Sequence, residues 1–161
     1  MKRRTKWIVG SVVAVIAVAL LVNPRLTNPP TDPGQNFLTS NSPPAEITTV
    51  LRNACFDCHS HETHWPWYSH VAPVSWWLAN HVLEGRQHLN FSHWPHDDPR
   101  RAAKWFRRIA DTVDSGDMPL PGYDRMHPAA RLDAVQRSNL VEWAQSEASR
   151  LRPADESATA N

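Results

Sequence analysis

The sequence has little cysteine and little glycine, with two cysteines and five glycines among 161 residues. Two cysteines cannot build the disulfide framework of a small secreted domain, so they either pair once or do chemistry. So few glycines argue against a Gly-rich nucleotide-binding α/β fold. The sequence also lacks an internal repeat and any clean period-two alternation, the pattern of a half-buried strand. These absences favour an all-α domain with long Pro- and aromatic-rich connections.

The chain also lacks a strong charge of either sign, because 17 basic side chains stand against 16 acidic ones. Four of the basic residues are Lys2, Arg3, Arg4 and Lys6, so the rest of the chain has 13 basic side chains and a net charge of −3. This balance excludes a nucleic-acid binder that works through a strong basic field. Tryptophan and histidine are abundant instead, with eight and nine residues.

An uncharged apolar run, residues 7–22 (WIVGSVVAVIAVALLV), follows the basic stub of residues 1–6. The run is shorter than the roughly 17–25 residues of a spanning helix and slightly longer than a signal-peptide core of about 7–15. No small-x-small cleavage site ends it, so we expect an uncleaved transmembrane signal anchor, with a cleaved signal peptide as the alternative. The positive-inside rule then places the stub in the cytoplasm and the remaining chain on the periplasmic, extracytoplasmic side of the inner membrane.

Three further segments are expected after the anchor. Residues 23–44 are rich in Pro, Asn, Thr and Ser, which predicts an extended linker that cannot bury enough surface to fold. Residues 45–151 form the expected folded domain, and residues 152–161 a polar, disordered tail. A domain of about 100 residues is small for a self-sufficient core, so a bound cofactor would help to stabilise it.

Two helices are expected in the first half of the domain. Ser42 can cap a helix that has Pro43 in its first turn and runs to about Ala54. A second helix starts near Pro73, and Gly85 is its expected C-terminal stop.

Two more helices are expected in the second half. Asp98 followed by Pro99 opens a third helix, which Gly116 ends. Asp133 with Gln136 three residues later resembles a capping box and starts a fourth. The expected apolar face of the fourth helix consists of Leu140, Val141, Ala144, Ala148 and Leu151, with Trp143 beside it.

The chemistry of the chain is expected at Cys55-Phe56-Asp57-Cys58-His59, a C-x-x-C-H motif of the kind that attaches c-type haem. Two thiols three residues apart on one turn can each form a thioether to a haem vinyl group. The adjacent imidazole can then bind the iron as the proximal ligand. The motif therefore predicts one covalent haem c, with Cys55, Cys58 and His59 as its binding residues.

Three other interpretations of the motif each need something that the sequence lacks. A zinc site commonly takes a second cysteine pair, although His61 and His64 could complete a Cys2His2 set. A thioredoxin-like redox pair belongs at the strand–helix junction of an α/β pattern. A plain disulfide would leave His59 and the surrounding aromatic residues without a purpose.

Met118 is the favoured sixth ligand of the iron. It lies in a Pro-flanked loop, SGDMPLP, directly after the third helix. A methionine thioether is a soft ligand that favours Fe(II) and raises the reduction potential. The alternatives are that Met118 only fills a gap in the core, or that Met126, His70 or His81 is the ligand.

Further residues are candidates for contacts with the haem. Trp67, Tyr68, Arg86 and Tyr123 could hydrogen-bond the haem propionates, and Pro73 could place its carbonyl on the ring N–H of the proximal histidine. A dense aromatic set after the motif is expected to pack around the porphyrin, namely Trp65, Trp67, Tyr68, Trp76 and Trp77. A basic cluster on the third helix is expected to be a solvated face that could also guide an acidic redox partner, namely Arg100, Arg101, Lys104, Arg107 and Arg108.

The run NACFDCHSHETHWPWYSHVAPVSWWLANHVLEGRQHLNFSHW, followed by SGDMPLPGYDRMHPAARL, resembles the bacterial haem-binding domain family of cytochrome-c-like proteins. The resemblance extends from about Pro44 to Ala148 and includes C-x-x-C-H, P-W-Y, G-R, N-F-S-x-W and M-P in this order. It implies a single-haem, class-I-like cytochrome c fold. It further implies attachment at Cys55 and Cys58, with His59 as the proximal and Met118 as the distal ligand.

The sequence thus predicts a membrane-anchored c-type cytochrome that transfers electrons to and from redox protein partners of a membrane or periplasmic chain. An electron carrier, rather than an enzyme, fits an iron with both axial positions filled. The alternatives are a peroxidase-like haem enzyme or sensor with a labile sixth ligand, and a structural domain in which haem only completes the core. No nucleic-acid partner is expected.

Overall fold

The computed structural model describes residues 2–21, 24 and 26–151, and this part of the chain contains helices and loops but no strand. The expected all-α class is therefore confirmed. The predicted tail, 152–161, lies outside the described residues. The α-helices are α1 Lys2–Leu21, α2 Phe37–Asn41, α3 Ala45–Ala54, α4 Phe56–His59, α5 Val74–His88, α6 Pro99–Asp114, α7 Tyr123–Met126 and α8 Ala134–Arg150. The 3-10 helices are η1 Pro33–Gln35, η2 Trp67–His70 and η3 Pro128–Ala130.

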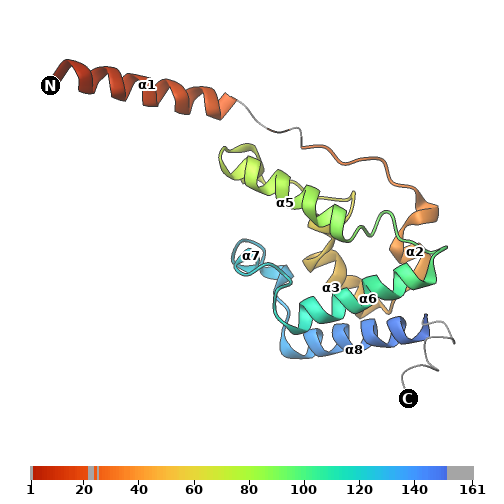
Figure 1. Cartoon of the computed structure of the whole chain (residues 1–161). Helices are drawn as coiled ribbons and strands as arrows, with labels where there is room; N and C mark the ends of the chain where they lie inside the picture. The colour runs from red at the N-terminus through yellow and green to blue at the C-terminus, as the bar shows by residue number, and fades with distance from the viewer. Residues whose placement is uncertain (1, 22–23, 25, 152–161) are drawn as a thin grey trace.

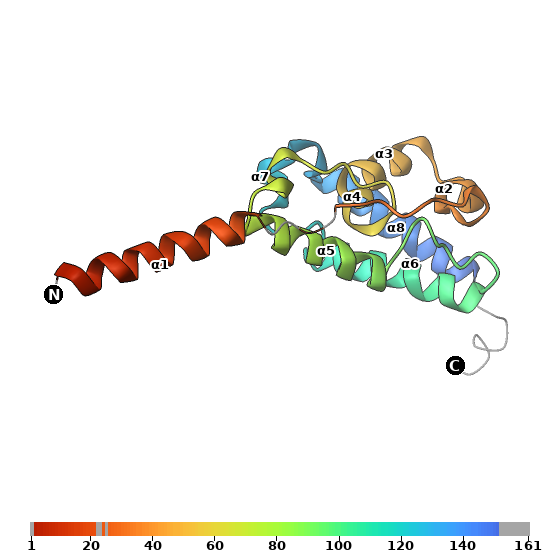
Figure 2. The ribbon, with the colours of Figure 1, turned by 90° about the horizontal axis from the view of Figure 1, so that it is seen from above.

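Helix α1 projects away from the body formed by the other helices (Figures 1 and 2). Its first residues carry the basic stub, and the apolar side chains that follow are exposed along it. Within the part of the chain that the structure describes, no helix has both the length and the apolar character needed to cross a membrane.

Helices α6 and α8 run antiparallel side by side and carry most of the core (Figures 1 and 2). Helix α6 begins as predicted, because the Asp98 side chain accepts a hydrogen bond from the Arg101 N–H at 3.0 Å and Pro99 occupies the first turn. Gly116, with φ at +80°, follows the end of this helix. Its buried residues recur at the helical period and face α8 and α3, namely Ala102, Ala103, Trp105, Phe106, Ile109, Ala110 and Val113.

The predicted start of α8 is also confirmed. Asp133 and Gln136 form a complete capping box in which each side chain accepts a hydrogen bond from the other residue's backbone N–H. The predicted apolar face is buried at Leu140, Val141, Ala144 and Ala148, while Leu151 and Trp143 are partly buried against the same core.

The predicted start of the first domain helix is wrong. Ser42 has φ at +43° and ends helix α2, while Pro44 precedes Ala45, the first residue of α3. The sequence contains a short helix that was not expected, α2, whose N-cap is Asn36. Ser42 turns the chain at the end of α2, so it cannot also cap α3.

The predicted linker is wrong for much of its length. Phe37 is fully buried and makes edge-on ring contacts with Phe91 and Trp94, with centroids at 5.1 and 4.5 Å. Its N–H donates to the Phe91 carbonyl at 2.8 Å, and upstream the Asn28 side chain donates to the Thr63 carbonyl at 2.9 Å. The buried Phe37 ring and these hydrogen bonds together hold the Pro-rich segment on the core, so the packed domain begins well before residue 45.

Candidate functional site

Helix α4 is a single turn that carries the C-x-x-C-H motif. Cys55 ends helix α3, with its N–H on the Leu51 carbonyl, and at the same time starts α4, with its carbonyl accepting from His59 N–H at 2.9 Å. Both Cys55 and Cys58 are free thiols. The break between α3 and α4 at Cys55 therefore leaves both thiols and the imidazole on one short turn.

His59 is oriented by the end of helix α5. Its Nδ1 lies 2.9 Å from the Gly85 carbonyl oxygen and 3.1 Å from that of Leu89. Since a carbonyl can only accept, Nδ1 carries the proton and the other ring nitrogen, Nε2, is left to bind a metal. Burial lowers the pKa of His59 below its ordinary value, although the two carbonyls act in the opposite direction. The imidazole is thus held neutral, which is the form that binds a metal.

The prediction that the Pro73 carbonyl orients His59 is wrong. The Pro73 carbonyl accepts hydrogen bonds from the N–H groups of Trp76 and Trp77, at 3.1 and 3.3 Å, in the first turn of α5. The predicted end of helix α5 at Gly85 is also wrong. Helix α5 continues to His88, and it is its last turn, not its first, that lies against α4.

Gly85 sits inside helix α5 because the two helices touch there. A Cβ atom added at Gly85 would lie 2.7 Å from the carbonyl oxygen of Cys58, closer than real side chains approach a backbone atom. The missing side chain therefore allows the close approach that puts the Gly85 carbonyl within reach of His59.

An apolar cavity of about 320 Å³ lies beside the motif, within the size range of ligand pockets. Both thiols and His59 line it from one side. Residues of α5, α6 and the loop that follows α6 complete its walls, namely His81, Glu84, Gly85, His88, Leu89, Arg108, Ile109, Thr112, Val113, Met118, Pro119, Leu120 and Tyr123, with Ala54 and Phe91. Most of the surface that lines the cavity is apolar, and the exposed residues Glu84, His88 and Arg108 are also part of its lining.

The two thiols lie in surroundings that keep them protonated. Burial raises the pKa of Cys55 to about 12 and that of Cys58 to about 11. A redox-active cysteine pair needs the opposite, a lowered thiol pKa, so this environment argues against the thioredoxin-like alternative.

The two histidines that the zinc alternative needs, His61 and His64, have other partners. The Nδ1 of His61 contacts the Pro30 carbonyl and its Nε2 the Asn90 side chain, each at 3.1 Å, while His64 contacts Asp57. Among the described residues, no group of three or more His, Cys, Asp or Glu side chains is placed to hold a metal ion.

Met118 reaches the cavity from the loop after α6. Its N–H donates to the Thr112 carbonyl at 2.9 Å, and its partly buried side chain packs on the core. The alternative methionine, Met126, is 60% exposed, and His70 is exposed as well. Of the histidine alternatives only His81 lines the cavity, where its Nδ1 is buried and finds no hydrogen-bond partner among the described residues.

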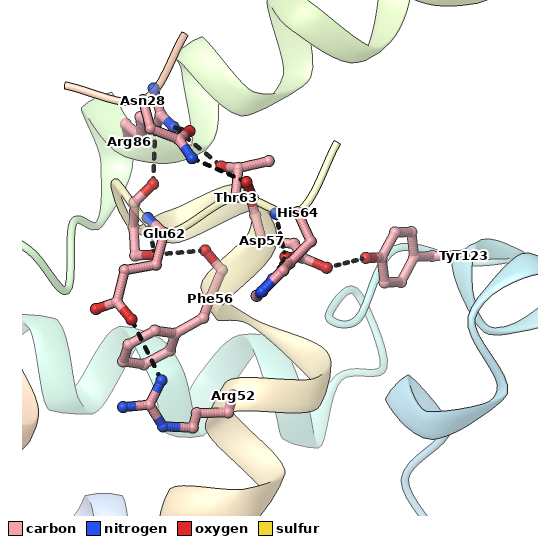
Figure 3. Close-up of polar contacts among 10 residues, drawn as sticks. Asn28, Arg52, Phe56, Asp57, Glu62, Thr63, His64, Arg86 and Tyr123 are labelled. Atoms are coloured by element: carbon pink, nitrogen blue, oxygen red, sulfur yellow. Dashed lines mark hydrogen bonds and ion pairs between the residues drawn. The ribbon is translucent and has the colours of Figure 1, made fainter. Parts of the chain in front are cut away.

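Of the four residues expected at the haem propionates, only Tyr123 lines the cavity. Arg86 points the other way, where it donates to the Ser60 carbonyl, the Asn28 side chain and the Thr63 hydroxyl at 2.8, 3.0 and 2.9 Å (Figure 3). Tyr68 bonds His127 through its hydroxyl. The Trp67 side chain is 74% exposed.

The expected aromatic shell around the porphyrin is also absent from the walls of the cavity as the structure describes them. Trp76 and Trp77 are 41% and 57% exposed, respectively, on the outer face of α5. Arg108, which the sequence placed on a solvated face of α6, is exposed as expected, but it also lines the cavity, a position that sequence reasoning missed. The signal that could have placed Arg108 at the cavity was its helical spacing from Thr112 together with its position next to Ile109.

A buried motif histidine, two protonated thiols and a methionine around one apolar cavity are features of a haem-binding protein. A family model described as a haem-binding domain matches residues 14–146, and the chain belongs to this family. The resemblance inferred from the motifs is thus confirmed. Neither the curated proteins nor the solved structures contain a match to the chain.

Proposed function

We propose that this haem protein is a c-type cytochrome that carries one covalent haem and transfers electrons. The observation that carries the proposal is that Cys55, Cys58, His59 and Met118, which lie up to 63 positions apart in the sequence, all line one apolar cavity. The residues fit the group, since the cavity offers two free thiols for attachment and an oriented imidazole for the iron.

The two thiols would form the covalent link. Each Sγ–H adds across one vinyl double bond, with the sulfur bonding one carbon and the hydrogen going to the other, so no oxidant is needed. The protonated state of Cys55 and Cys58 matches this addition. Attachment at two points would keep the cofactor in a domain whose own core is small.

His59 and Met118 would bind the iron of the haem. When bound, the haem supplies an iron that takes up and releases one electron. The carbonyls of Gly85 and Leu89 hold the Nδ1–H of His59 and so direct Nε2 to the metal. A soft thioether at Met118 would favour the reduced iron.

The protein would work at the outer face of the inner membrane, with redox proteins of a membrane or periplasmic electron-transfer chain as partners. The basic stub and the uncharged run of residues 7–22 support an anchor at the N-terminus. Fractionation of cells that express the full chain tests this proposal. Recovery of the protein from the periplasmic extract without detergent would contradict a retained anchor.

Acid–acetone extraction tests covalent attachment. We expect the haem of the periplasm-expressed protein to stay with the polypeptide, and to be extracted from a variant with both Cys55→Ala and Cys58→Ala. Extraction of the haem from the wild-type protein would contradict the c-type assignment, while the family assignment as a haem-binding domain would stand.

A second candidate function is a haem enzyme or sensor with a labile sixth ligand. The observation in its favour is His81, which lines the same cavity as Arg108 and whose buried Nδ1 has no hydrogen-bond partner among the described residues. A polar pair of this kind is what a distal acid–base site requires. Rapid binding of carbon monoxide by the wild-type ferrous protein would favour this candidate over the electron carrier.

A further inference from the structure

Asp57 lies between the two cysteines of the motif and joins three parts of the fold. Its carboxylate accepts a hydrogen bond from the Tyr123 hydroxyl at 3.2 Å, from the His64 backbone N–H at 2.9 Å and contacts the His64 Nδ1 at 3.2 Å (Figure 3). Its backbone carbonyl accepts from the Thr63 hydroxyl at 2.6 Å. The residue is therefore fixed from several sides, although a haem-attachment motif leaves this position free.

Tyr123 comes from the segment that carries Met118. It opens helix α7, five positions after Met118, and it lines the large cavity together with that residue. The backbone hydrogen bonds of this segment are local. The Met118 N–H donates to the Thr112 carbonyl at the end of α6, and the Tyr123 N–H donates to the Leu120 carbonyl. The bond from Tyr123 to Asp57 thus links the segment to helix α4 across 66 positions of sequence.

The surroundings of Tyr123 keep this bond rigid. Its ring stacks on His127 with centroids at 4.1 Å and planes 11° apart, and His127 in turn bonds the Tyr68 hydroxyl. Burial raises the pKa of the Tyr123 phenol above its ordinary value, so the hydroxyl stays a donor. The cavity beside this junction has only about 10 Å³, room for no more than about one water molecule. The space at this junction is too small for a ligand, so we interpret the Tyr123–Asp57 hydrogen bond as a structural link between the two segments.

We propose that Tyr123 is a positioning residue that, through its hydrogen bond to Asp57, fixes the Met118 loop against the haem-attachment helix and keeps the thioether on the iron. Two ligands of one iron come from α4 and from a loop on the far side of the cavity. A hydrogen bond between these same two parts limits the movement of the loop. A charged acceptor strengthens this hydrogen bond. The inference rests on the proposed His/Met ligation.

The experiment measures how easily an added ligand replaces Met118. Ferric full-chain protein, purified with its haem, is titrated with imidazole while the Met–Fe(III) charge-transfer band is followed. We expect Tyr123→Phe to bind imidazole about tenfold more tightly than wild type, which corresponds to about 1.4 kcal/mol. Asp57→Asn keeps an oxygen acceptor without its charge, so an intermediate increase is expected. The double variant should be no more affected than Tyr123→Phe alone, because both changes remove one interaction.

Two variants serve as controls. Asn139→Ala removes a hydrogen bond between α8 and Glu46, away from the cavity, and should leave the imidazole affinity unchanged. Tyr68→Phe removes a hydroxyl at the same junction but leaves the Asp57 bond, so its effect should be smaller than that of Tyr123→Phe. Hydrogen exchange of residues 118–126 adds a readout independent of the spectrum, with faster exchange expected in Tyr123→Phe.

The outcomes separate the inference from the proposed function. A wild-type protein without the charge-transfer band would overturn both Met118 ligation and this role of Tyr123. A wild-type protein with the band, combined with unchanged imidazole affinity in Tyr123→Phe, would overturn only the role of Tyr123. If Tyr123→Phe does not retain haem, Asp57→Asn decides alone, and wild-type imidazole affinity in that variant would overturn the role of Tyr123.

Discussion

At the scale of single residues, the site depends on a glycine that brings two helices together. The carbonyls of Gly85 and Leu89 lie near the Nδ1 of His59 only because α5 can approach α4 at Gly85. The orientation of the His59 imidazole is therefore set by the backbone of another helix. This arrangement fixes the tautomer of the imidazole and leaves its Nε2 for the iron.

The substitution Gly85→Ala should destabilise the protein by about 1–2 kcal/mol. Overpacking against a backbone atom costs about 1–3 kcal/mol, which outweighs the gain of up to about 1 kcal/mol in helix propensity. Denaturant unfolding of the haem-loaded protein measures the difference. In Gly10→Ala, the matched control, nothing lies within 4 Å of the added Cβ. Stabilisation by Gly85→Ala would contradict the close contact.

The substitution Met118→Ala should convert a six-coordinate, low-spin iron into one that binds carbon monoxide in the ferrous state, and should lower the reduction potential. Optical spectroscopy and a redox titration measure both changes. Met126→Ala is the control, because Met126 is 60% exposed and should leave the spectrum unchanged. An unaltered spectrum in Met118→Ala would transfer the sixth position to His81, the histidine that lines the cavity.

At the scale of elements, the short helix α2 contributes more than its five residues suggest. It places the fully buried Phe37 among Phe91, Trp94, Phe106 and Trp143. Phe91 also stacks on Phe56 of the motif helix, with centroids at 4.8 Å. The aromatic core thus connects the N-terminal segment to the turn that carries the C-x-x-C-H motif.

The substitution Phe37→Ala should cost about 3–5 kcal/mol of unfolding free energy, the usual effect of removing a buried aromatic side chain. Chemical denaturation followed by circular dichroism measures it. Val135→Ala is the control, because Val135 is 65% exposed on α8. A cost below about 1 kcal/mol would restore the view that residues 23–44 are only a linker.

At the scale of the whole molecule, the haem is expected to act as part of the core. The cavity of about 320 Å³ separates α4 and α5 from α6 and its following loop. Without the cofactor these walls would lose their common contact surface. The stability of the domain should therefore depend on whether the haem is attached.

A variant with both Cys55→Ala and Cys58→Ala, freed of haem, should unfold about 10 °C below the loaded wild type. This shift corresponds to a loss of about 2–3 kcal/mol for a domain of this size. Thermal unfolding by circular dichroism measures it. The same variant reloaded with haem, which is then bound without covalent links, is the control and should recover part of the difference. Coinciding transitions for all three proteins would argue that the haem adds nothing to the core.

The sequence by itself determined haem as the cofactor and the starts of helices α6 and α8. The local spacing of the C-x-x-C-H motif indicates its ligand. The caps at Asp98 and Asp133 act on residues three positions away. Such signals lie within one turn and need no knowledge of the fold. The family assignment follows from the same local motifs.

Only the tertiary structure decided which backbone orients His59, and that Gly85 serves a helix contact and not a helix end. It also showed Phe37 in the core and Arg86, Trp67 and Tyr68 away from the cavity. These outcomes depend on contacts between segments tens of residues apart, which composition and spacing do not encode. Packing decides them, because a buried position is defined by what surrounds it in space.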